Sequence, residues 1–336
     1  MNPLVSVVVT TYNQAAYIEQ TLESVFAQTY DSYEVIVVDD GSTDDTPARL
    51  ARFNGRIEYV RQLNTGVAGS RNTGVGKARG EFIAFLDGDD LWETEKLSLQ
   101  VAEARRHPEA GLIAVDGLQF DGDRIIEPTL FFGPACKDLP EESVTSGSYY
   151  HQLLHNQFIY TTSQIMVPAK VLRAVGLSDG RFKRASDYDL YLRIAAKYDF
   201  IIIKKRLTRW RYLPTSASGP MLLRLFNYLL EDVAILRHHL VLCHKSDRAL
   251  IRGVLRRKQA EGMERLYRYG LAHDRPFATR ALLTLLAASP VVPVAFIYLA
   301  GLWCPAVVRD RFAPVVRRML CGLNEFKATP DAATKS

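Results

Sequence analysis

The chain has 336 residues, of which 48% are hydrophobic and 24% charged, and its formal net charge is +5. This composition is too apolar for a disordered chain, and the length suffices for one large domain or two smaller ones. The charge is modest and no run of Lys and Arg interleaved with aromatic residues occurs before the C-terminal region, which argues against a nucleic-acid partner.

Neither the cysteines nor the N-terminus indicates a secreted protein. The four cysteines show no Cys-x-x-Cys spacing, so neither a zinc site nor a disulfide framework is predicted. Residues 1–11 are apolar but carry no cationic leader and no small-residue cleavage site. They therefore predict a first buried strand rather than a signal peptide, and we expect a cytoplasmic protein.

Up to residue 90, short β-branched runs alternate with helical patterns. Strands are predicted at residues 5–10, 34–38, 57–60 and 82–86. Helices are predicted after the first strand, from about Thr43, and within residues 66–79. This βαβ spacing favours an α/β fold with a Rossmann-like, mostly parallel sheet covered by helices on both faces.

Beyond residue 90 the pattern is less regular. The predicted elements are a helix at 91–106, a strand near 111–115, a loop at 116–148, a strand at 159–167, a helix at 187–198 and a strand at 200–203. The composition shifts at about 214–220, after which the chain is basic, leucine-rich and helical in pattern. We expect a catalytic domain at 1–215 and a C-terminal helical extension at 216–336.

Polar residues follow three of the predicted strands. They are Thr10-Thr11-Tyr12-Asn13, Asp39-Asp40-Gly41-Ser42 and Asp87-Gly88-Asp89-Asp90. Ligands bind at the carboxyl ends of strands in open parallel sheets. Asp and Gly also cap strands and start turns, but three such endings together favour a ligand site.

The third ending concentrates acidic side chains directly after an apolar run. Their mutual repulsion is unfavourable without a cation, and magnesium commonly binds through one or two carboxylates together with substrate phosphates. The pattern predicts a magnesium or manganese site at Asp87 and Asp89, although solvated Asp-rich turns are common.

Five ordered blocks carry a resemblance to a known family. They are Ser6 to Asn13, Val37 to Asp44, Asn64 to Gly66 with Ser70 to Asn72, Gly80 to Ile83, and Phe85 to Asp90. In order and spacing they resemble glycosyltransferase family 2, over roughly residues 4 to 212. The resemblance implies a GT-A fold, a nucleoside diphosphate-sugar donor and a divalent cation.

The resemblance also implies roles for the residues of the donor side. The positions that hold the nucleotide base and ribose are matched by Thr10, Tyr12 and Asp40. Asp87 matches the carboxylate that faces the ribose or donor sugar, and Asp89 the one that binds the metal on the diphosphate. Arg71 is a candidate second contact to the nucleotide, with a solvated surface arginine as the alternative.

The acceptor side is expected in the acidic block that begins at Ser186. Asp187 matches the family's catalytic base, which takes the proton of the attacking hydroxyl; an N-cap carboxylate without a chemical task is the alternative. Asp189 and Arg193 are predicted to form a structural ion pair. Ser186 stands where the family often has an acidic residue, and residues 176–179 lack its usual aromatic after the glycine, so the acceptor preference stays open. Leu213 stands where histidine is frequent in the family, so a metal or phosphate contact from that position is missing.

We therefore expect an inverting glycosyltransferase that uses a nucleoside diphosphate-sugar, with UDP favoured, and a glycan or lipid-linked acceptor in cell-surface polysaccharide or glycolipid synthesis. A nucleotidyltransferase would need a Gly-rich, basic phosphate loop after the first strand, and Thr11 to Gln20 contains neither Gly nor Lys. A catalytically silent sugar-nucleotide-binding or scaffold protein is the other alternative, favoured if Asp187 lies far from the acidic cluster.

The C-terminal region predicts contact with a membrane. Residues 281–308 contain no charged side chain, a stretch longer than the ~20 residues that a span requires. Three prolines interrupt it and four arginines follow it: Pro290, Pro293, Pro305, Arg309, Arg311, Arg317 and Arg318. We expect a monotopic hairpin or interfacial helices at the inner face of the cytoplasmic membrane, ahead of a full span or a soluble helical cap.

Overall fold

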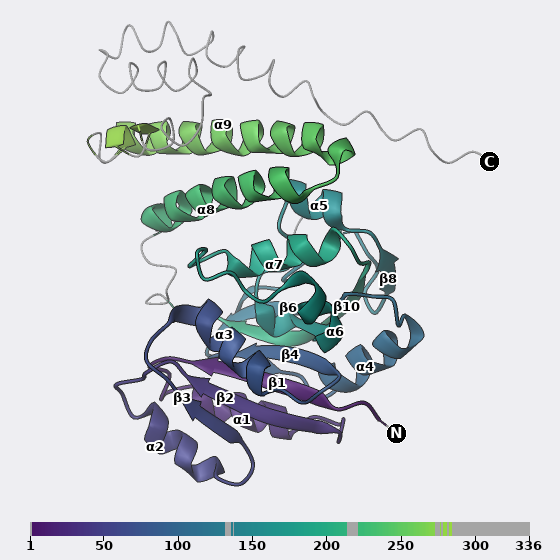
Figure 1. The fold of residues 1–336 in the computed structure, drawn as a ribbon. Helices are drawn as coiled ribbons and strands as arrows, with labels where there is room; N and C mark the ends of the chain where they lie inside the picture. Colours follow the sequence, from purple (N-terminus) through teal and green to yellow (C-terminus); the bar gives the residue numbers. More distant parts are fainter. Residues whose placement is uncertain are drawn as a thin grey trace, which may run out of the picture. The chain divides into compact units, whose positions relative to one another are not determined.

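The computed structural model describes residues 2–131, 136, 138–213, 221–272, 276, 278–280 and 282–283. The chain divides into two compact units, Met1–Ala217 and Ser218–Ser336. The described part of the first unit carries a ten-stranded sheet with helices, and that of the second is helical (Figure 1).

The sheet has the strand order β3-β2-β1-β4-β9-β6-β10-β5, with β7 paired to β6 and β8 to β10. Its strands are β1 (Val5–Thr11), β2 (Tyr33–Asp39), β3 (Glu58–Arg61), β4 (Phe82–Asp87), β5 (Leu91–Trp92), β6 (Leu112–Asp121), β7 (Arg124–Glu127), β8 (Val144–Gly147), β9 (Ile165–Pro168) and β10 (Phe200–Arg211). β1, β2, β3, β4, β6 and β10 run in one direction, and the others run against them. The predicted α/β fold is confirmed.

Helices cover both faces of the parallel half of the sheet. The helices of this unit are α1 (Ile18–Phe26), α2 (Thr46–Leu50), α3 (Gly66–Lys77), α4 (Lys96–Arg106), α5 (Tyr150–His155), α6 (Ala169–Val175) and α7 (Ser186–Ala195). Alternate residues of β1 point to opposite faces. Val5, Val7 and Val9 join a buried cluster with side chains of α1, α2 and α4. Val8 points the other way, against Gly74 of α3.

Several predicted boundaries between residues 91 and 168 were wrong. The helix predicted at 91–106 begins only at Lys96, because Leu91–Trp92 pairs with β10 as β5. The predicted loop at 116–148 holds the end of β6 together with β7 and β8. The strand predicted at 159–167 contains a 3-10 turn, η2 (Thr162–Gln164), before β9.

A buried carboxylate explains much of the order in the predicted loop. Asp116 accepts hydrogen bonds from the backbone N–H groups of Leu130 and Phe131 at 2.8 and 3.1 Å, and from Thr129 Oγ1 at 2.7 Å. Its charge is paired with Lys204 Nζ at 2.8 Å, and both side chains are almost fully buried. One acidic residue therefore folds the chain back against β6 and β10, an interaction that local patterning does not reveal.

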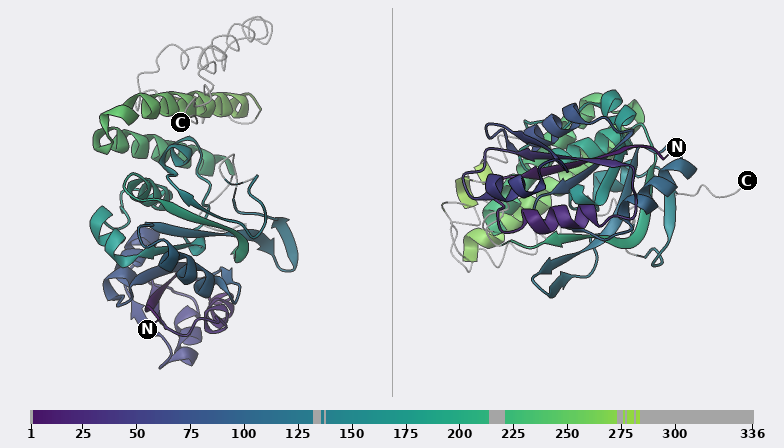
Figure 2. Two further views of the ribbon diagram at one scale, coloured as in Figure 1. Left: turned by 90° about the vertical axis from the view of Figure 1, so that its right-hand side faces the viewer. Right: turned by 90° about the horizontal axis from the view of Figure 1, so that it is seen from below.

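The described part of the second unit is a helical hairpin. α8 (Met221–Leu242) and α9 (Arg248–Ala272) pack side by side and are joined by the short turn η3 (Lys245–Asp247), as Figure 2 also shows. None of the helices in the described ranges is both long enough and apolar enough to cross a membrane. The prediction for residues 281–308 falls, except for Leu282 and Leu283, outside the described residues.

The packing of α3 on β1 predicts opposite effects for two glycines of the same helix. A Cβ at Gly74 would meet Val8 Cγ1 at 2.2 Å, whereas a Cβ at Gly76 would meet nothing within 4 Å. Gly74→Ala is therefore expected to lower the free energy of unfolding by about 1–3 kcal/mol. Gly76→Ala, the matched control, should raise it by about 0.5–1 kcal/mol through helix propensity. Denaturant melts of both variants test this, and equal midpoints would contradict the packing described.

Candidate active site

The three polar strand endings meet at one edge of the sheet. β1 lies between β2 and β4, with Thr11 opposite Asp39 and Thr10 opposite Asp87. The loops that follow β1 and β2 are also tied together, since Asn13 Oδ1 accepts a hydrogen bond from the Thr43 N–H at 2.8 Å. The parallel register thus brings residues from distant parts of the sequence to one position.

The predicted base- and ribose-binding residues differ in their surroundings. Thr10 is buried, and its hydroxyl lies 3.4 Å from Asp87 Oδ1. Tyr12 is 48% exposed, so its ring is accessible from solvent. Asp40 is buried and accepts hydrogen bonds from the backbone N–H groups of Thr65 at 2.9 Å and Gly66 at 2.8 Å. Asp40 therefore holds the start of α3, the helix that carries Arg71.

Arg71 is the central cation of the site. Its side chain is 8% exposed, and its Nη2 donates to Asp87 Oδ1 at 2.8 Å. Burial lowers the pKa of Arg71, but the charges of Asp87 and Asp187 outweigh this effect, and the net shift is upward. The guanidinium therefore stays protonated beside both carboxylates. Within the described part of the chain, its Nε has no hydrogen-bond partner.

The acidic turn after β4 separates into two partly exposed carboxylates and one buried carboxylate. Asp87 and Asp89 are partly exposed, whereas Asp90 is fully buried. Burial, followed by the charge of Asp87, raises the pKa of Asp89 to about 6. Asp90 accepts hydrogen bonds from Ser163 Oγ at 2.6 Å and the Arg211 N–H at 3.0 Å. Asp90 thus anchors the turn and leaves the other two carboxylates facing the site.

The accessible donor set fits a hard divalent cation. No group of three or more His, Cys, Asp or Glu side chains is arranged to hold a metal ion among the described residues. Magnesium sites often use only one or two protein carboxylates, with phosphate oxygens and water completing the shell. Burial and then the charge of Asp87 raise the pKa of Asp89, and a bound cation would favour its ionised form.

Sequence reasoning missed the residues that brace this turn from the side. Thr161 Oγ1 lies 3.3 Å from carboxylate oxygens of both Asp87 and Asp90, and Ser163 Oγ accepts from the Asp87 N–H at 3.1 Å. Thr161 and Gln164 form a capping box around the 3-10 turn. The Thr-x-x-Gln spacing was the available signal, but it lies inside an apolar run that resembles a strand.

The predicted base, Asp187, is also within electrostatic reach of Arg71. Asp187 stands in the first turn of α7 and accepts a hydrogen bond from the Tyr188 N–H at 2.8 Å. Burial raises the pKa of Asp187 to about 6, while the charge of Arg71 opposes this shift and that of Asp87 adds to it. One guanidinium therefore acts electrostatically on both predicted half-sites.

Tyr191, one turn further along α7, was not singled out from the sequence. Its side chain is fully buried, and burial followed by the charge of Asp187 raises its pKa well above the ordinary value. Its hydroxyl has no hydrogen-bond partner among the described residues. The i, i+4 spacing from Asp187 was the only signal that could have placed it beside the site.

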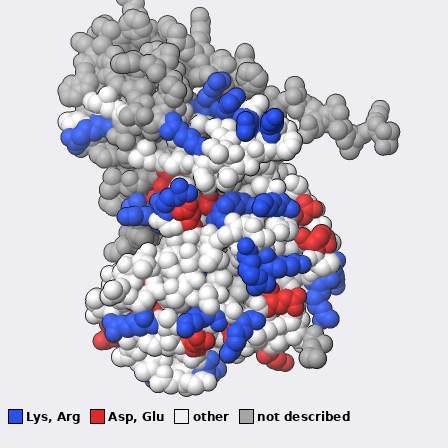
Figure 3. Space-filling view, viewed as in Figure 1, with Lys and Arg blue, Asp and Glu red and all other residues white. Residues whose placement is uncertain are grey.

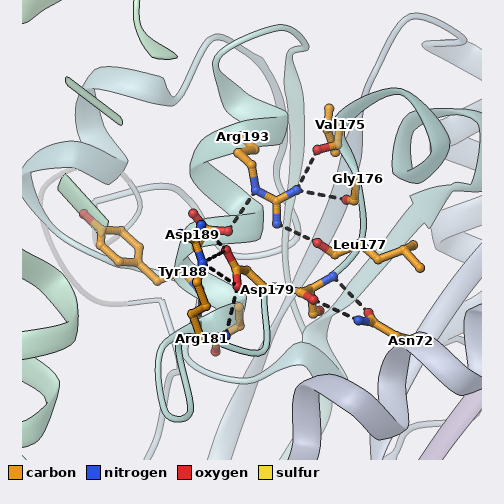
Figure 4. A network of polar contacts seen from close by, with 11 residues as sticks. Asn72, Val175, Gly176, Leu177, Asp179, Arg181, Tyr188, Asp189 and Arg193 are labelled. Atoms are coloured by element: carbon orange, nitrogen blue, oxygen red, sulfur yellow. Dashed lines mark hydrogen bonds and ion pairs between the residues drawn. The ribbon is translucent and has the colours of Figure 1, made fainter. Parts of the chain in front are cut away.

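The segment at residues 175–178, which precedes α7, is held by hydrogen bonds to its main chain (Figure 4). Asn72 of α3 donates to the Ser178 carbonyl at 2.8 Å and accepts from the Ser178 N–H at 3.0 Å. From the opposite side, Arg193 donates to the carbonyls of residues 175, 176 and 177 at 2.7–2.9 Å. The predicted ion pair between Arg193 and Asp189 is present at 2.8 Å. These contacts join α3 to α7 and so relate Arg71 to Asp187.

Arg211, at the end of β10, supports the acidic turn after β4. Its Nε donates to the Asp89 carbonyl at 2.8 Å, and its guanidinium lies 4.7 Å from the Tyr17 ring centroid. Burial lowers the pKa of Arg211, although the charges of Asp89 and Asp90 oppose this shift. The side chain therefore supports the turn that presents Asp89.

Comparison with known proteins identifies the family in which this architecture occurs. A model of glycosyl transferase family 2 matches residues 6–176. A glycosyltransferase of Rickettsia typhi is 28% identical over 213 residues, which cover 61% of this chain and 64% of that protein. This chain thus spans less than two thirds of that relative's length.

Solved structures show the same fold. TarS residues 1–349 of Staphylococcus aureus in complex with UDP-GlcNAc superpose with a TM-score of 0.61 at 19% identity, covering 95% of this chain and 91% of that one. The same protein in complex with UDP gives a TM-score of 0.57 at 18% identity, covering 96% and 88%. With the GT-A type fold and a family model that matches about half of its length, the chain belongs to glycosyl transferase family 2.

Proposed function

We propose that the protein is an inverting glycosyltransferase that transfers one sugar from a nucleoside diphosphate-sugar, UDP being the favoured nucleotide, to a hydroxyl of a glycan or lipid-linked acceptor. The observation that carries this proposal is the position of Arg71, whose charge acts on both Asp87 and Asp187. UDP is favoured because related structures are complexes with UDP and UDP-GlcNAc. The product would enter cell-surface polysaccharide or glycolipid synthesis.

On the donor side, Asp87 and Asp89 would hold a magnesium or manganese ion against the diphosphate. Such an ion supplies Lewis-acid stabilisation of the negative charge that develops on the departing nucleoside diphosphate. Thr10, Tyr12 and Asp40 would line the nucleoside end, where Tyr12 offers an exposed ring. Arg71 orients Asp87 through their ion pair. Its Nε, which has no hydrogen-bond partner among the described residues, can donate a hydrogen bond to the nucleotide-sugar.

Removing the Asp89 carboxylate should uncouple nucleotide binding from the cation. In Asp89→Ala, we expect UDP binding in the presence of manganese to weaken by about 100-fold, which corresponds to ~3 kcal/mol of lost interaction. Calorimetry with UDP, TDP and GDP, each with and without manganese, measures this. Asp123→Ala, which removes an exposed carboxylate from a turn outside the site, is the matched control. Unchanged manganese dependence in Asp89→Ala would contradict the assignment.

On the acceptor side, Asp187 is the proposed general base. The acceptor hydroxyl oxygen attacks the anomeric carbon from the face opposite the diphosphate, and its proton passes to an Asp187 carboxylate oxygen. The bond between the anomeric carbon and the diphosphate oxygen breaks, and its electron pair leaves with the diphosphate. The scaffold alternative required Asp187 to lie apart from the acidic cluster, and its electrostatic coupling to Arg71 and Asp87 speaks for catalysis. No residue of the loop after β1 suggests the nucleotidyltransferase alternative.

Substitutions of two neighbouring carboxylates of α7 should separate an effect on catalysis from an effect on stability. Asp187→Asn is expected to lower kcat by about 10²- to 10⁴-fold, the range for loss of a general base, with manganese-dependent UDP binding retained. Asp189→Asn breaks the buried pair with Arg193 and should instead lower the free energy of unfolding by about 3 kcal/mol. Single-turnover rates and thermal melts distinguish the two effects. A normal kcat in Asp187→Asn would refute its role.

The pH dependence of kcat should report the same carboxylate. Because burial raises the pKa of Asp187 to about 6, the base becomes protonated and inactive as the pH falls through that value. At saturating donor and manganese, kcat should be constant above this pH and fall about tenfold per unit well below it. The residual kcat of Asp187→Asn should lack this limb. An acidic limb that survives the substitution would assign the titration to another group.

We further propose that the C-terminal region holds the enzyme at the inner face of the cytoplasmic membrane, as a peripheral or monotopic protein. The charge-free stretch at 281–308 and the arginines that follow it support this localisation. Membrane contact would bring the catalytic unit to lipid-linked acceptors.

A further inference from the structure

The turn between α8 and α9 exposes two large aliphatic side chains. Val241 is 77% exposed and Leu242 is 57% exposed, both at the end of α8. Other apolar residues of these helices, such as Leu236 and Ile251, are buried. The exposure is therefore local to the turn and is not a consequence of loose packing between the two helices.

Basic side chains come shortly after this aliphatic pair in the sequence. Lys245 and Arg248 are exposed, and Arg252 and Arg256 continue from Arg248 at intervals of four residues along α9. This spacing places the three arginines along one stripe of the helix. None of these four side chains forms an ion pair within the described residues. Figure 3 shows Lys and Arg side chains along this hairpin.

Farther along the hairpin, several cations are paired with acidic side chains. Lys258 pairs with Asp232, and Arg268 pairs with Glu264, each at 2.5 Å. Exposed cations without an ion pair among the described residues are thus most frequent near the turn, where Asp247 is the one acidic residue of η3; Arg265 is a further such cation, far along α9. We define the hairpin tip as Val241, Leu242, Lys245 and Arg248.

We propose that the hairpin tip docks on an anionic lipid surface, with Val241 and Leu242 inserted at the level of the headgroups and Lys245 and Arg248 against lipid phosphates. Exposed aliphatic groups beside cations suit an interface that is apolar below and anionic above. Arg252 and Arg256 extend the same charge away from the tip. The inference deepens the membrane association proposed above and names a surface outside residues 281–308 for it.

The composition of the tip favours lipid over nucleic acid. Single-stranded nucleic acid is bound on aromatic stacking platforms within cationic grooves, whereas the exposed apolar side chains here are aliphatic. A second copy of this chain is also a poorer occupant, because like cationic tips would repel each other.

The test is sedimentation of the full chain with vesicles of phosphatidylcholine alone or with phosphatidylglycerol added. The wild type should bind the anionic vesicles more tightly, and salt should weaken this binding. In Lys245→Glu/Arg248→Glu, partitioning onto anionic vesicles should fall by at least about 25-fold, since each cation near such a surface contributes about fivefold. Lys77→Glu/Arg124→Glu, at exposed cations of the first unit, is the matched control and should bind normally.

A second variant, Val241→Ser/Leu242→Ser, tests insertion without a change of charge. It should bind anionic vesicles more weakly while keeping its melting temperature and manganese-dependent UDP binding. Wild-type vesicle binding by both tip variants would overturn the assignment of the tip but leave membrane association through 281–308 standing. A variant that loses an oligomeric state in solution, without any change in vesicle binding, would assign the tip to self-association. Loss of UDP binding alone would concern the donor site and not this surface.

Discussion

The ion pair between the buried Arg71 and the partly exposed Asp87 is the interaction on which the site depends. Four carboxylates, those of Asp87, Asp89, Asp90 and Asp187, lie in its neighbourhood, as their mutual effects on pKa show. Unpaired charges in a poorly solvated region cost several kcal/mol each. The charge of Arg71 opposes the effect of burial on the pKa of Asp187 and so favours the ionised carboxylate that proton abstraction requires.

Two contacts of the fold hold this guanidinium in place. Asp40, at the end of β2, fixes the first residues of α3, and Gly74 lets the same helix approach β1 closely. Arg71 lies between these two fixed points. The position of one charged group is thus determined by a carboxylate that fixes the start of a helix and by a missing side chain near its end.

Much of this could be predicted from the sequence. The strands before residue 90 were recognisable from β-branched runs, and the polar endings of β1, β2 and β4 pointed to a common edge. Beyond residue 90 prediction was weaker, because β5 and β8 are short strands that exist only through pairing with distant residues of β10. Thr161 and Ser163 were missed for the same reason, since their contacts are with residues more than 70 positions away. Local patterning carries no information about such contacts.

The hydrogen bonds that hold the segment at 175–178 determine which of its positions can change. Asn72 and Arg193 hold that segment only by its backbone N–H and carbonyl groups, which every amino acid other than proline supplies. Gly176 has a φ of +86° and so must stay glycine, and Ser178 is buried. The side chains of Val175 and Leu177 take no part in these hydrogen bonds, so they can change without disturbing the link between α3 and α7. Sequence change at these two positions is compatible with an unchanged framework around Arg71, which accords with one fold being reused for many functions.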